Sequence, residues 1–301
     1  MRVLTFALVM LISGCVTAPP LTSHFLNQRP VRLVNEADFI SQKRNHCGPA
    51  TLTMSAQRYT SDVSLSEVTS LAFTPGANGS FKGDMLSAAR RIGLAAYSIP
   101  SPERMIEFVQ AGHSVLLFQD LGALWIRVWH FALLLGYDTR NKTFILHSGP
   151  DAYKENSARE VLRTWERGGK WSFALVPAGV IPNGVSHEEA LANAMALMAV
   201  GHQRGALELY QKLSLLWPNK YESYAGMAEV YFSQNQLTQA EVHLRKAIAI
   251  SPLHPGLQFN LSQILYRSRR PSEAETAFKA SLALATSEDQ RKLFLKRHRQ
   301  N

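Results

Sequence analysis

Cys47 is the residue of this chain with the clearest potential for nucleophilic chemistry. Gly48 and Pro49 follow it, and residues 50–59 have the composition of a helix. Proline suits the first helical turn, because the N–H groups there have no partner within the helix. A cysteine at a helix N-terminus is stabilised as the reactive thiolate by those N–H groups and by the helix dipole. A lone cysteine is more often a small core residue, so its neighbours decide the interpretation.

Two further residues complete a candidate catalytic set. Gln42 lies five residues before Cys47, where its amide can donate to a tetrahedral oxyanion beside the Cys47 N–H. His130 opens the apolar strand predicted at 131–137 and is placed to act as a general base. A single histidine at such a position is usually structural, but its combination with Gln42 and Cys47 favours catalysis.

The order of these motifs resembles the bacteriocin-processing peptidases that cleave double-glycine leaders. The resemblance covers about residues 31–178 and rests on Gln42 and on the segments 47–50 and 130–138. It implies a papain-like cysteine peptidase in which Cys47 is the nucleophile, His130 the base and then the acid, and Gln42 part of the oxyanion hole. The chain has no phosphate-binding glycine loop, so the transporter-coupled role of that family is not expected here.

The third catalytic residue departs from the family. An Asp or Asn usually follows the histidine by about 18 residues, and Ser148 occupies that position here. A serine hydroxyl can accept a hydrogen bond from imidazole but carries no charge, so it stabilises an imidazolium less. His147 and Asp151 are the alternatives, although strand alternation places His147 on the opposite face from Ser148.

Residues 31–182 combine both kinds of secondary structure, as expected for an α+β papain-like domain. We predict helices over 50–59, 65–71, 84–92 (with Asp84 as N-cap) and 102–110. We predict strands over 95–99, 114–119, 129–137, 143–147 and 171–176. The strands beginning at 114, 129 and 143 are expected to pair antiparallel, and residues 177–183 form the domain boundary.

From residue 187 onward the pattern is entirely helical and repeats every 34 residues. Positions at this spacing hold the same kind of residue: Ala206, Ala240 and Ala274; Tyr210, Leu244 and Phe278; Leu216, Ile250 and Leu284; Pro218 and Pro252. The period resembles the tetratricopeptide repeat, which implies an all-α domain at 187–286 with about three units and a protein partner. The first unit lacks a standard first-helix motif, as expected of a unit that packs on the preceding domain.

The N-terminus resembles a bacterial lipoprotein signal. A basic start, an apolar run at 3–12 and two small residues precede Cys15. The resemblance implies a signal peptide at 1–14, lipidation of Cys15 and anchoring in the cell envelope, at the outer membrane facing the periplasm. Residues 15–30 contain three prolines and are interpreted as an extended tether. An ordinary cleaved signal with an incidental cysteine is the alternative.

Composition narrows the remaining classes. Of the 301 residues, 46% are hydrophobic and 18% charged, which excludes wholesale disorder. The net charge is +9, and within the basic tail at 287–301 the last eleven residues contribute +5 through Arg291, Lys292, Lys296, Arg297 and Arg299. A solvated helix end explains this cluster better than a nucleic-acid or lipid surface. The histidines show no metal-ligand spacing, so we expect no metal and no cofactor.

The sequence therefore predicts a lipid-anchored cysteine peptidase that acts on a peptide or protein, with repeats that bind a protein partner. A non-catalytic assembly scaffold with a degenerate peptidase fold is the alternative, and the missing acidic residue favours it. An amidase or transferase that uses the same thiolate is a third interpretation. Trp125 and Trp129, beside His130, either line a substrate groove or cover the domain.

Overall fold

A computed structural model describes residues 23–29, 31–34, 38–42, 45–123 and 125–298. The expected signal peptide, the lipidation site Cys15 and the first part of the tether lie outside these residues. Within them, each helix is too short or too polar to cross a lipid bilayer. The extended-tether prediction is wrong for helix α1 (Ser23–Leu26), because Phe25 is buried and its ring contacts those of Tyr137 and Phe144.

Seven antiparallel strands form one sheet in the described part of the chain. They are β1 (Val31–Leu33), β2 (Leu94–Ser98), β3 (Val115–Asp120), β4 (Trp129–Asp138), β5 (Thr143–Ser148), β6 (Asp151–Ser157) and β7 (Ser172–Pro177). Their order is β2-β7-β3-β4-β5-β6, and β1 pairs with β4. The predicted antiparallel pairing of β3, β4 and β5 is confirmed. The polar edge strand β6 was not predicted, because its sequence lacks apolar alternation.

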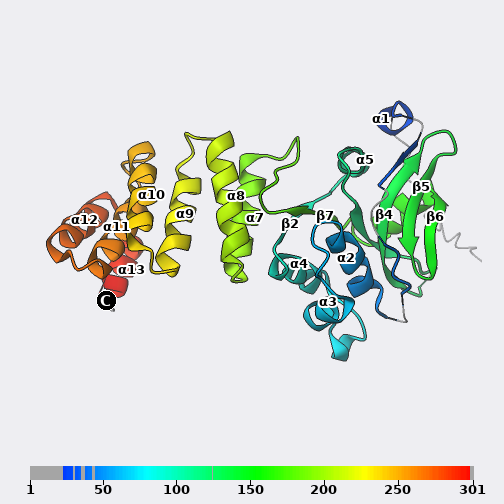
Figure 1. Ribbon diagram of the computed structural model, residues 1–301, viewed down its shortest axis with the longest axis horizontal. Coiled ribbons are helices and arrows are strands. Elements are labelled where there is room, and N and C mark those ends of the chain that lie inside the picture. The colour runs from blue at the N-terminus through cyan, green and yellow to red at the C-terminus, as the bar shows by residue number, and fades with distance from the viewer. Residues whose placement is uncertain (1–22, 30, 35–37, 43–44, 124, 299–301) are drawn as a thin grey trace, which may run out of the picture.

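Helices cover both faces of the sheet (Figure 1). Their bounds are α2 (Cys47–Gln57), α3 (Leu65–Ala72), η1 (Pro75–Ala77), α4 (Lys82–Arg91), α5 (Pro102–Gln110) and α6 (Ala158–Arg167). Phe131 and Leu133 of β4 pack with α2, α3 and α4, whereas Ala132 and Leu134 pack with α5 and α6. Because successive side chains of a strand point to opposite faces, the continuous apolar run of β4 is buried on both sides.

Helix α4 differs from its prediction at its start. It begins at Lys82, with Phe81 at the N-cap, rather than after Asp84. Asp84 lies in the first turn, where its carboxylate accepts a hydrogen bond from the Thr74 hydroxyl at 2.7 Å. The carboxylate is therefore occupied by the preceding loop, not by the helix N–H groups.

Three helix pairs and a final helix make up the C-terminal region, which extends away from the sheet (Figure 1). They are α7 (His187–Ala199), α8 (Gln203–Leu216), α9 (Tyr221–Ser233), α10 (Leu237–Ile250), α11 (Pro255–Arg267), α12 (Pro271–Leu284) and α13 (Glu288–His298). The repeated alanines Ala206, Ala240 and Ala274 are fully buried. Small side chains at these positions let neighbouring helices approach closely, so the 34-residue spacing has a direct packing cause.

The first repeat helix docks on the edge of the sheet. The side chain of Asn193 in α7 accepts a hydrogen bond from the Ala96 N–H of β2 at 2.9 Å. Arg104 of α5 forms an ion pair with Glu189 of α7, in which Nη2 donates to both carboxylate oxygens at 2.7 and 2.8 Å. The contact covers an edge strand whose N–H groups otherwise lack partners, as expected for a first unit that packs on the preceding domain.

The basic C-terminal segment is more ordered than a solvated tail. Helix α13 extends to His298, and its Phe294 is 6% exposed. The Phe294 ring stacks on Phe259 of α11 with the centroids 4.6 Å apart. The helix therefore covers an apolar surface that the last repeat would otherwise leave open.

Candidate active site

Cys47 is the first residue of α2, and its sulfur lies beside β4. His46 is the N-cap, and the sulfur accepts hydrogen bonds from the backbone N–H groups of Cys47, Gly48 and Phe131. A side chain at Gly48 would bring its Cβ within 2.7 Å of the Ser80 hydroxyl oxygen. Glycine is therefore required here for the loop before α4 to close over the start of α2.

The protonation of Cys47 differs from the sequence expectation. Burial raises the pKa of the Cys47 thiol, and this effect outweighs the lowering by the three N–H donors. We expected the helix start to favour the thiolate. The difference has a physical cause: Cys47 is half-buried between α2, β4 and the loop before α4, so the charged form loses part of its hydration.

His130 lies near the start of β4 and contacts the predicted third residue. Its Nε2 is 2.9 Å from the hydroxyl oxygen of Ser148 at the end of β5. Burial, with a smaller contribution from the positive charge of Lys154, lowers the pKa of His130 to about 4. The imidazole is therefore neutral at neutral pH, with Nε2 engaged by Ser148.

The backbone next to His130 contacts the Cys47 sulfur. Phe131, whose N–H contacts the Cys47 sulfur, directly follows His130. Among the described residues, no hydrogen bond joins Cys47 to His130 itself. Such contacts are often long without substrate and shorten when it binds. The resting site thus holds a neutral thiol beside a neutral imidazole.

The Gln42 side chain contacts helix α2, which carries Cys47, and the turn that follows Ser148. Its Nε2 donates to the Thr51 hydroxyl at 3.4 Å, and its Oε1 accepts the Gly149 N–H at 3.1 Å. Thr51 lies one turn after Cys47 in α2 and donates to the carbonyl of Phe131 at 3.4 Å. The amide therefore ties the start of α2 to the turn after Ser148. Its second Nε2 hydrogen has no partner among the described residues and is available to a ligand.

The two alternatives to Ser148 have other partners. His147 is fully buried, and its Nδ1 accepts the Tyr153 N–H at 3.1 Å. The Asp151 carboxylate forms an ion pair with Lys154 at 2.8 Å. Of the three candidates, Ser148 is the one with a hydrogen bond to His130. Sequence alternation had already placed His147 on the other face of β5.

A groove of about 920 Å³ opens on Cys47. Its walls include the aromatic side chains of Phe118, Trp129 and Phe131, together with Lys82 and residues 77–81 of the loop before α4. Trp125 is 83% exposed and does not line this groove. The two tryptophans that the sequence could not separate thus have different positions, and Trp129 is the one that lines the groove.

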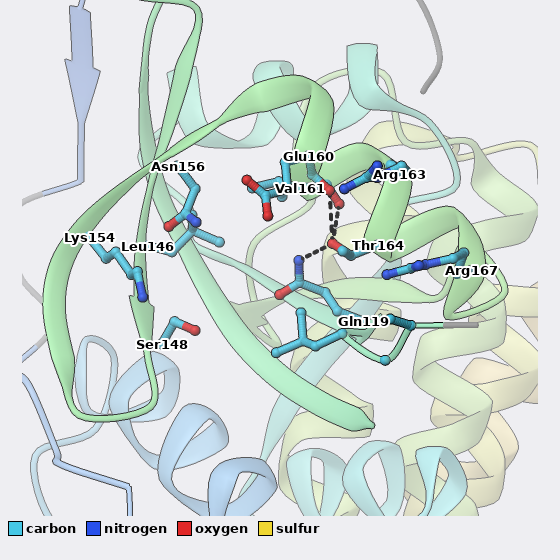
Figure 2. A pocket seen from close by; sticks show the side chains of 13 residues that line it. Gln119, Leu146, Ser148, Lys154, Asn156, Glu160, Val161, Arg163, Thr164 and Arg167 are labelled. Carbon is cyan, nitrogen blue, oxygen red and sulfur yellow. Dashed lines mark hydrogen bonds between the residues drawn. The ribbon is translucent and has the colours of Figure 1, made fainter. Parts of the chain in front are cut away.

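A second cavity, of about 540 Å³, lies behind Ser148 (Figure 2). Ser148 and Lys154 contribute from the β5–β6 hairpin, whereas Arg163 and Thr164 contribute from α6. Thr164 accepts a hydrogen bond from Gln119 of β3 at 2.6 Å. The sequence analysis missed this helix, although its buried residues Val161, Leu162 and Trp165 follow helical spacing.

In the described part of the chain, no cluster of His, Cys, Asp and Glu side chains has a composition that could hold a metal ion. Cys47, the one free thiol in the described part of the chain, accepts hydrogen bonds from backbone N–H groups.

Comparison with known proteins supports the repeats. A tetratricopeptide-repeat family model matches residues 233–293. The solved structure of MamA is 17% identical over 38% of this chain and 69% of its own, with a TM-score of 0.33. The Yersinia enterocolitica type III secretion translocator chaperone SycD is 17% identical over 36% of this chain and 83% of its own, with a TM-score of 0.35. Such low scores carry no argument about function, and no curated protein matches the chain.

Proposed function

We propose that the repeat region binds a protein partner and that the chain acts as an interaction scaffold. The observation that carries the proposal is the tetratricopeptide-repeat match at 233–293. A cavity of about 500 Å³ between α9, α11 and α13 offers a place for a partner segment. Its lining combines apolar Phe232 and Phe259 with the polar side chains of Glu229 and Gln263, a composition suited to a peptide.

Site-specific photocrosslinking tests this proposal. A benzoylphenylalanine at Gln263, inside the cavity, is expected to crosslink a distinct protein in cells. The same residue at Val242, which is 45% exposed and does not line the cavity, serves as the control. Identical crosslinking patterns at the two positions would contradict partner binding through this face.

A cysteine hydrolase is the second candidate function, with peptide bonds as the substrate class. The hydrogen bond between His130 and Ser148 favours it, together with the position of Cys47 on the wall of an open groove. The thiol proton passes to His130, and the sulfur attacks the amide carbonyl to form a tetrahedral oxyanion. The C–N bond then breaks as His130 protonates the amine, and water hydrolyses the thioester with His130 as base.

Binding must change the resting protonation for this chemistry to proceed. Burial opposes both the thiolate and the imidazolium, so the ion pair is unfavourable in the free site. An oxyanion held by the Cys47 N–H and by the unused Nε2 hydrogen of Gln42 stabilises negative charge only once substrate is attacked. The proposed enzyme therefore has a low thiol reactivity until a substrate occupies the groove.

Exposure to a peptide library separates the two functions of the α/β region. The purified protein is incubated with peptides derived from a proteome, and new termini are identified by mass spectrometry. We expect termini that depend on Cys47 and are absent with Cys47→Ala. If both proteins leave the library unchanged, the α/β region supports the scaffold without catalysis.

We also propose the lipid anchor at Cys15, on the resemblance of residues 1–15 to a lipoprotein signal. Cys15→Ser should shift the protein from the membrane fraction to the soluble fraction or leave it uncleaved. Intact mass spectrometry of the mature wild-type protein provides the decisive measurement, since an unmodified N-terminus away from residue 15 contradicts anchoring.

A further inference from the structure

The groove beside Cys47 is lined by more positive than negative side chains. The side chains of Lys82, Arg127 and Arg167 line it, and among the described residues no carboxylate does. Arg127 is neutralised by an ion pair with Asp120, whose side chain is 2% exposed. Arg167 donates to the backbone carbonyl of Asp120 at 2.7 Å and has no carboxylate partner among the described ion pairs. Positive charge therefore remains available to a bound molecule.

The ammonium group of Lys82 is fixed in this groove by one hydrogen bond and two aromatic rings. Its Nζ donates to the Gly168 carbonyl at 2.9 Å and lies 4.6 Å from the ring centroid of Phe118 and 5.8 Å from that of Trp171. Neither the carbonyl nor the rings carry a formal negative charge. An ammonium group has three N–H donors, and one of them is used here. The remaining donors are available to an anion entering the groove.

A continuous wall connects Lys82 to the sulfur. Phe131 contacts the sulfur through its N–H, and its ring lies 4.8 Å from that of Phe118, beneath Lys82. Two aromatic residues thus separate the nucleophile from the ammonium group. A group bound by Lys82 therefore belongs to the substrate segment next to the cleaved bond, not to the reacting carbonyl.

We propose that the groove binds a peptide carrying a carboxylate close to the cleaved amide, with Lys82 as the residue that recognises it. The aromatic side chains of Phe118 and Phe131 contact the apolar part of the same peptide segment. The carboxylate is supplied by an Asp or Glu side chain or by a peptide C-terminus, which share this chemistry. The inference rests on the proposed hydrolase function and specifies its substrate class.

Matched alkylating peptides test the inference without requiring hydrolysis. The probes are iodoacetyl-Ala-Glu-amide, its Gln counterpart, and iodoacetyl-Ala-Ala with a free C-terminus. In each, the sulfur forms a bond to the methylene carbon, iodide leaves, and the thiol proton passes to the buffer. We expect the Glu probe to alkylate Cys47 about three- to fivefold faster than the Gln probe, as for one partly exposed ion pair. The free C-terminus shows whether a terminal carboxylate is accepted too.

The variant Lys82→Gln should reduce the Glu-to-Gln rate ratio to about one, because it keeps a donor for Gly168 and removes the charge. Lys170→Gln is the matched control, since Lys170 is exposed, pairs with Glu166 at 2.9 Å and does not line the groove. Its ratio should equal that of the wild type. Equal rates for Glu and Gln probes, or a preference that survives Lys82→Gln, would overturn the inference.

A peptide titration followed by NMR tests the same inference without the Cys47 thiol. The ¹⁵N-labelled Cys47→Ala protein is titrated with acetyl-Ala-Glu-Ala-Glu-amide and with its glutamine counterpart. Shifts of the Gly168 and Gly169 amides with the acidic peptide alone support the inference, even if the library shows no hydrolysis. Shifts with both peptides, or with neither, refute it, whereas cleavage of the library by the wild-type protein would leave the hydrolase proposal intact.

Discussion

The two regions of this molecule differ in how far apart in the sequence their contacting residues lie. In the repeat region, contacts join helices that follow one another in the chain, such as α9 with α10 and α11 with α12. In the candidate site, the Gln42 side chain contacts Gly149, 107 residues away. A periodic pattern can therefore specify the repeats locally, whereas the site exists only after the sheet has brought distant segments together.

Their buried polar groups differ as well. The repeat interfaces are built around alanines such as Ala240 and Ala274, which need only close packing. The α/β region half-buries an imidazole and a thiol whose charged forms are both disfavoured by their surroundings. Loss of packing should therefore damage the repeats and leave the chemistry intact, and loss of a polar group should do the reverse. The predictions below test this separation.

Removal of the general base should have the largest effect. His130→Ala is expected to lower Cys47-dependent cleavage by about 10²–10⁴-fold, the usual contribution of a positioned proton acceptor. Circular dichroism should show unchanged helical content, because His130 makes no contact with the repeats. His113→Gln is the control, since that histidine bonds to the Tyr59 hydroxyl away from the site. Retained cleavage in His130→Ala would contradict the proposed mechanism.

The role of Gln42 requires a substitution that spares its structural bond. Gln42→Glu keeps an oxygen that accepts the Gly149 N–H and removes the Nε2 donor, with a size-matched side chain. Loss of one oxyanion donor costs about 10²–10³-fold in turnover, and the introduced charge opposes the oxyanion further. Steady-state cleavage should show the loss in kcat, with KM nearly unchanged. A loss confined to KM would assign Gln42 to substrate binding instead.

Overpacking of one helix crossing should affect the repeats alone. Ala240 is fully buried between helices, so Ala240→Trp forces the pair apart and is expected to destabilise the repeats by about 3 kcal/mol, at the upper end for overpacking. Thermal unfolding followed by circular dichroism measures the change. Val242→Trp, at a position 45% exposed in the same helix, should change stability by less than about 0.5 kcal/mol.

Reactivity of Cys47 toward iodoacetamide completes that test. It should be the same in Ala240→Trp as in the wild type at temperatures where the sheet stays folded. A parallel loss of reactivity would mean that the contact between α7 and β2 transmits the damage to the sheet.

The low pKa of His130 predicts an acid-sensitive α/β region. The unfolded chain binds a proton near pH 6.5, whereas the folded chain does so only near pH 4. Between these values the unfolded state holds more protons, so the stability gained at higher pH is lost as the pH falls from about 6.5 to about 4, by about 1–3 kcal/mol. Urea unfolding at several pH values should show this slope in the wild type and a flatter one in His130→Gln.

Lys154→Gln provides the matched electrostatic control for that slope. Removal of the Lys154 charge removes the smaller of the two causes that lower the pKa of His130. The slope should therefore decrease without disappearing, since burial of the imidazole persists. An NMR titration of His130 that gives a pKa near 6.5 would contradict both expectations.

Sequence patterns predicted the elements that carry regular spacing. The repeat helices and the strands β3, β4 and β5 follow from period and apolar runs. Helix α6 was missed even though Val161, Leu162 and Trp165 mark its buried face, because the surrounding residues are strongly polar. The polar strand β6 could not be predicted from its own residues, since its pairing with β5 determines it.

One contact of the candidate site was predictable, and its electrostatics was not. The family resemblance placed Ser148 as the partner of His130, and these two side chains are in hydrogen-bond contact. The raised pKa of Cys47 depends on how tightly β4 and the loop before α4 enclose the sulfur, and no local pattern encodes that enclosure. Lys82 was missed because its relation to the groove depends on Phe118, Trp171 and Gly168, which lie 36 to 89 residues away in the chain.

The smallest effect should come from Ser148, and it decides what kind of site this is. The hydroxyl contributes one neutral hydrogen bond to the imidazole, worth about 1 kcal/mol, so Ser148→Ala should slow turnover by about tenfold or less. Ser148→Asp adds a negative charge at Nε2, which raises the pKa of His130 and stabilises the imidazolium of the ion pair. If the turnover of Ser148→Asp exceeds that of the wild type, the native chain is a hydrolase whose base, His130, is weakened by its uncharged partner. If Ser148→Asp folds normally, as judged by circular dichroism, and stays inactive toward the peptide library, the groove serves binding alone and both regions of the molecule act as scaffold.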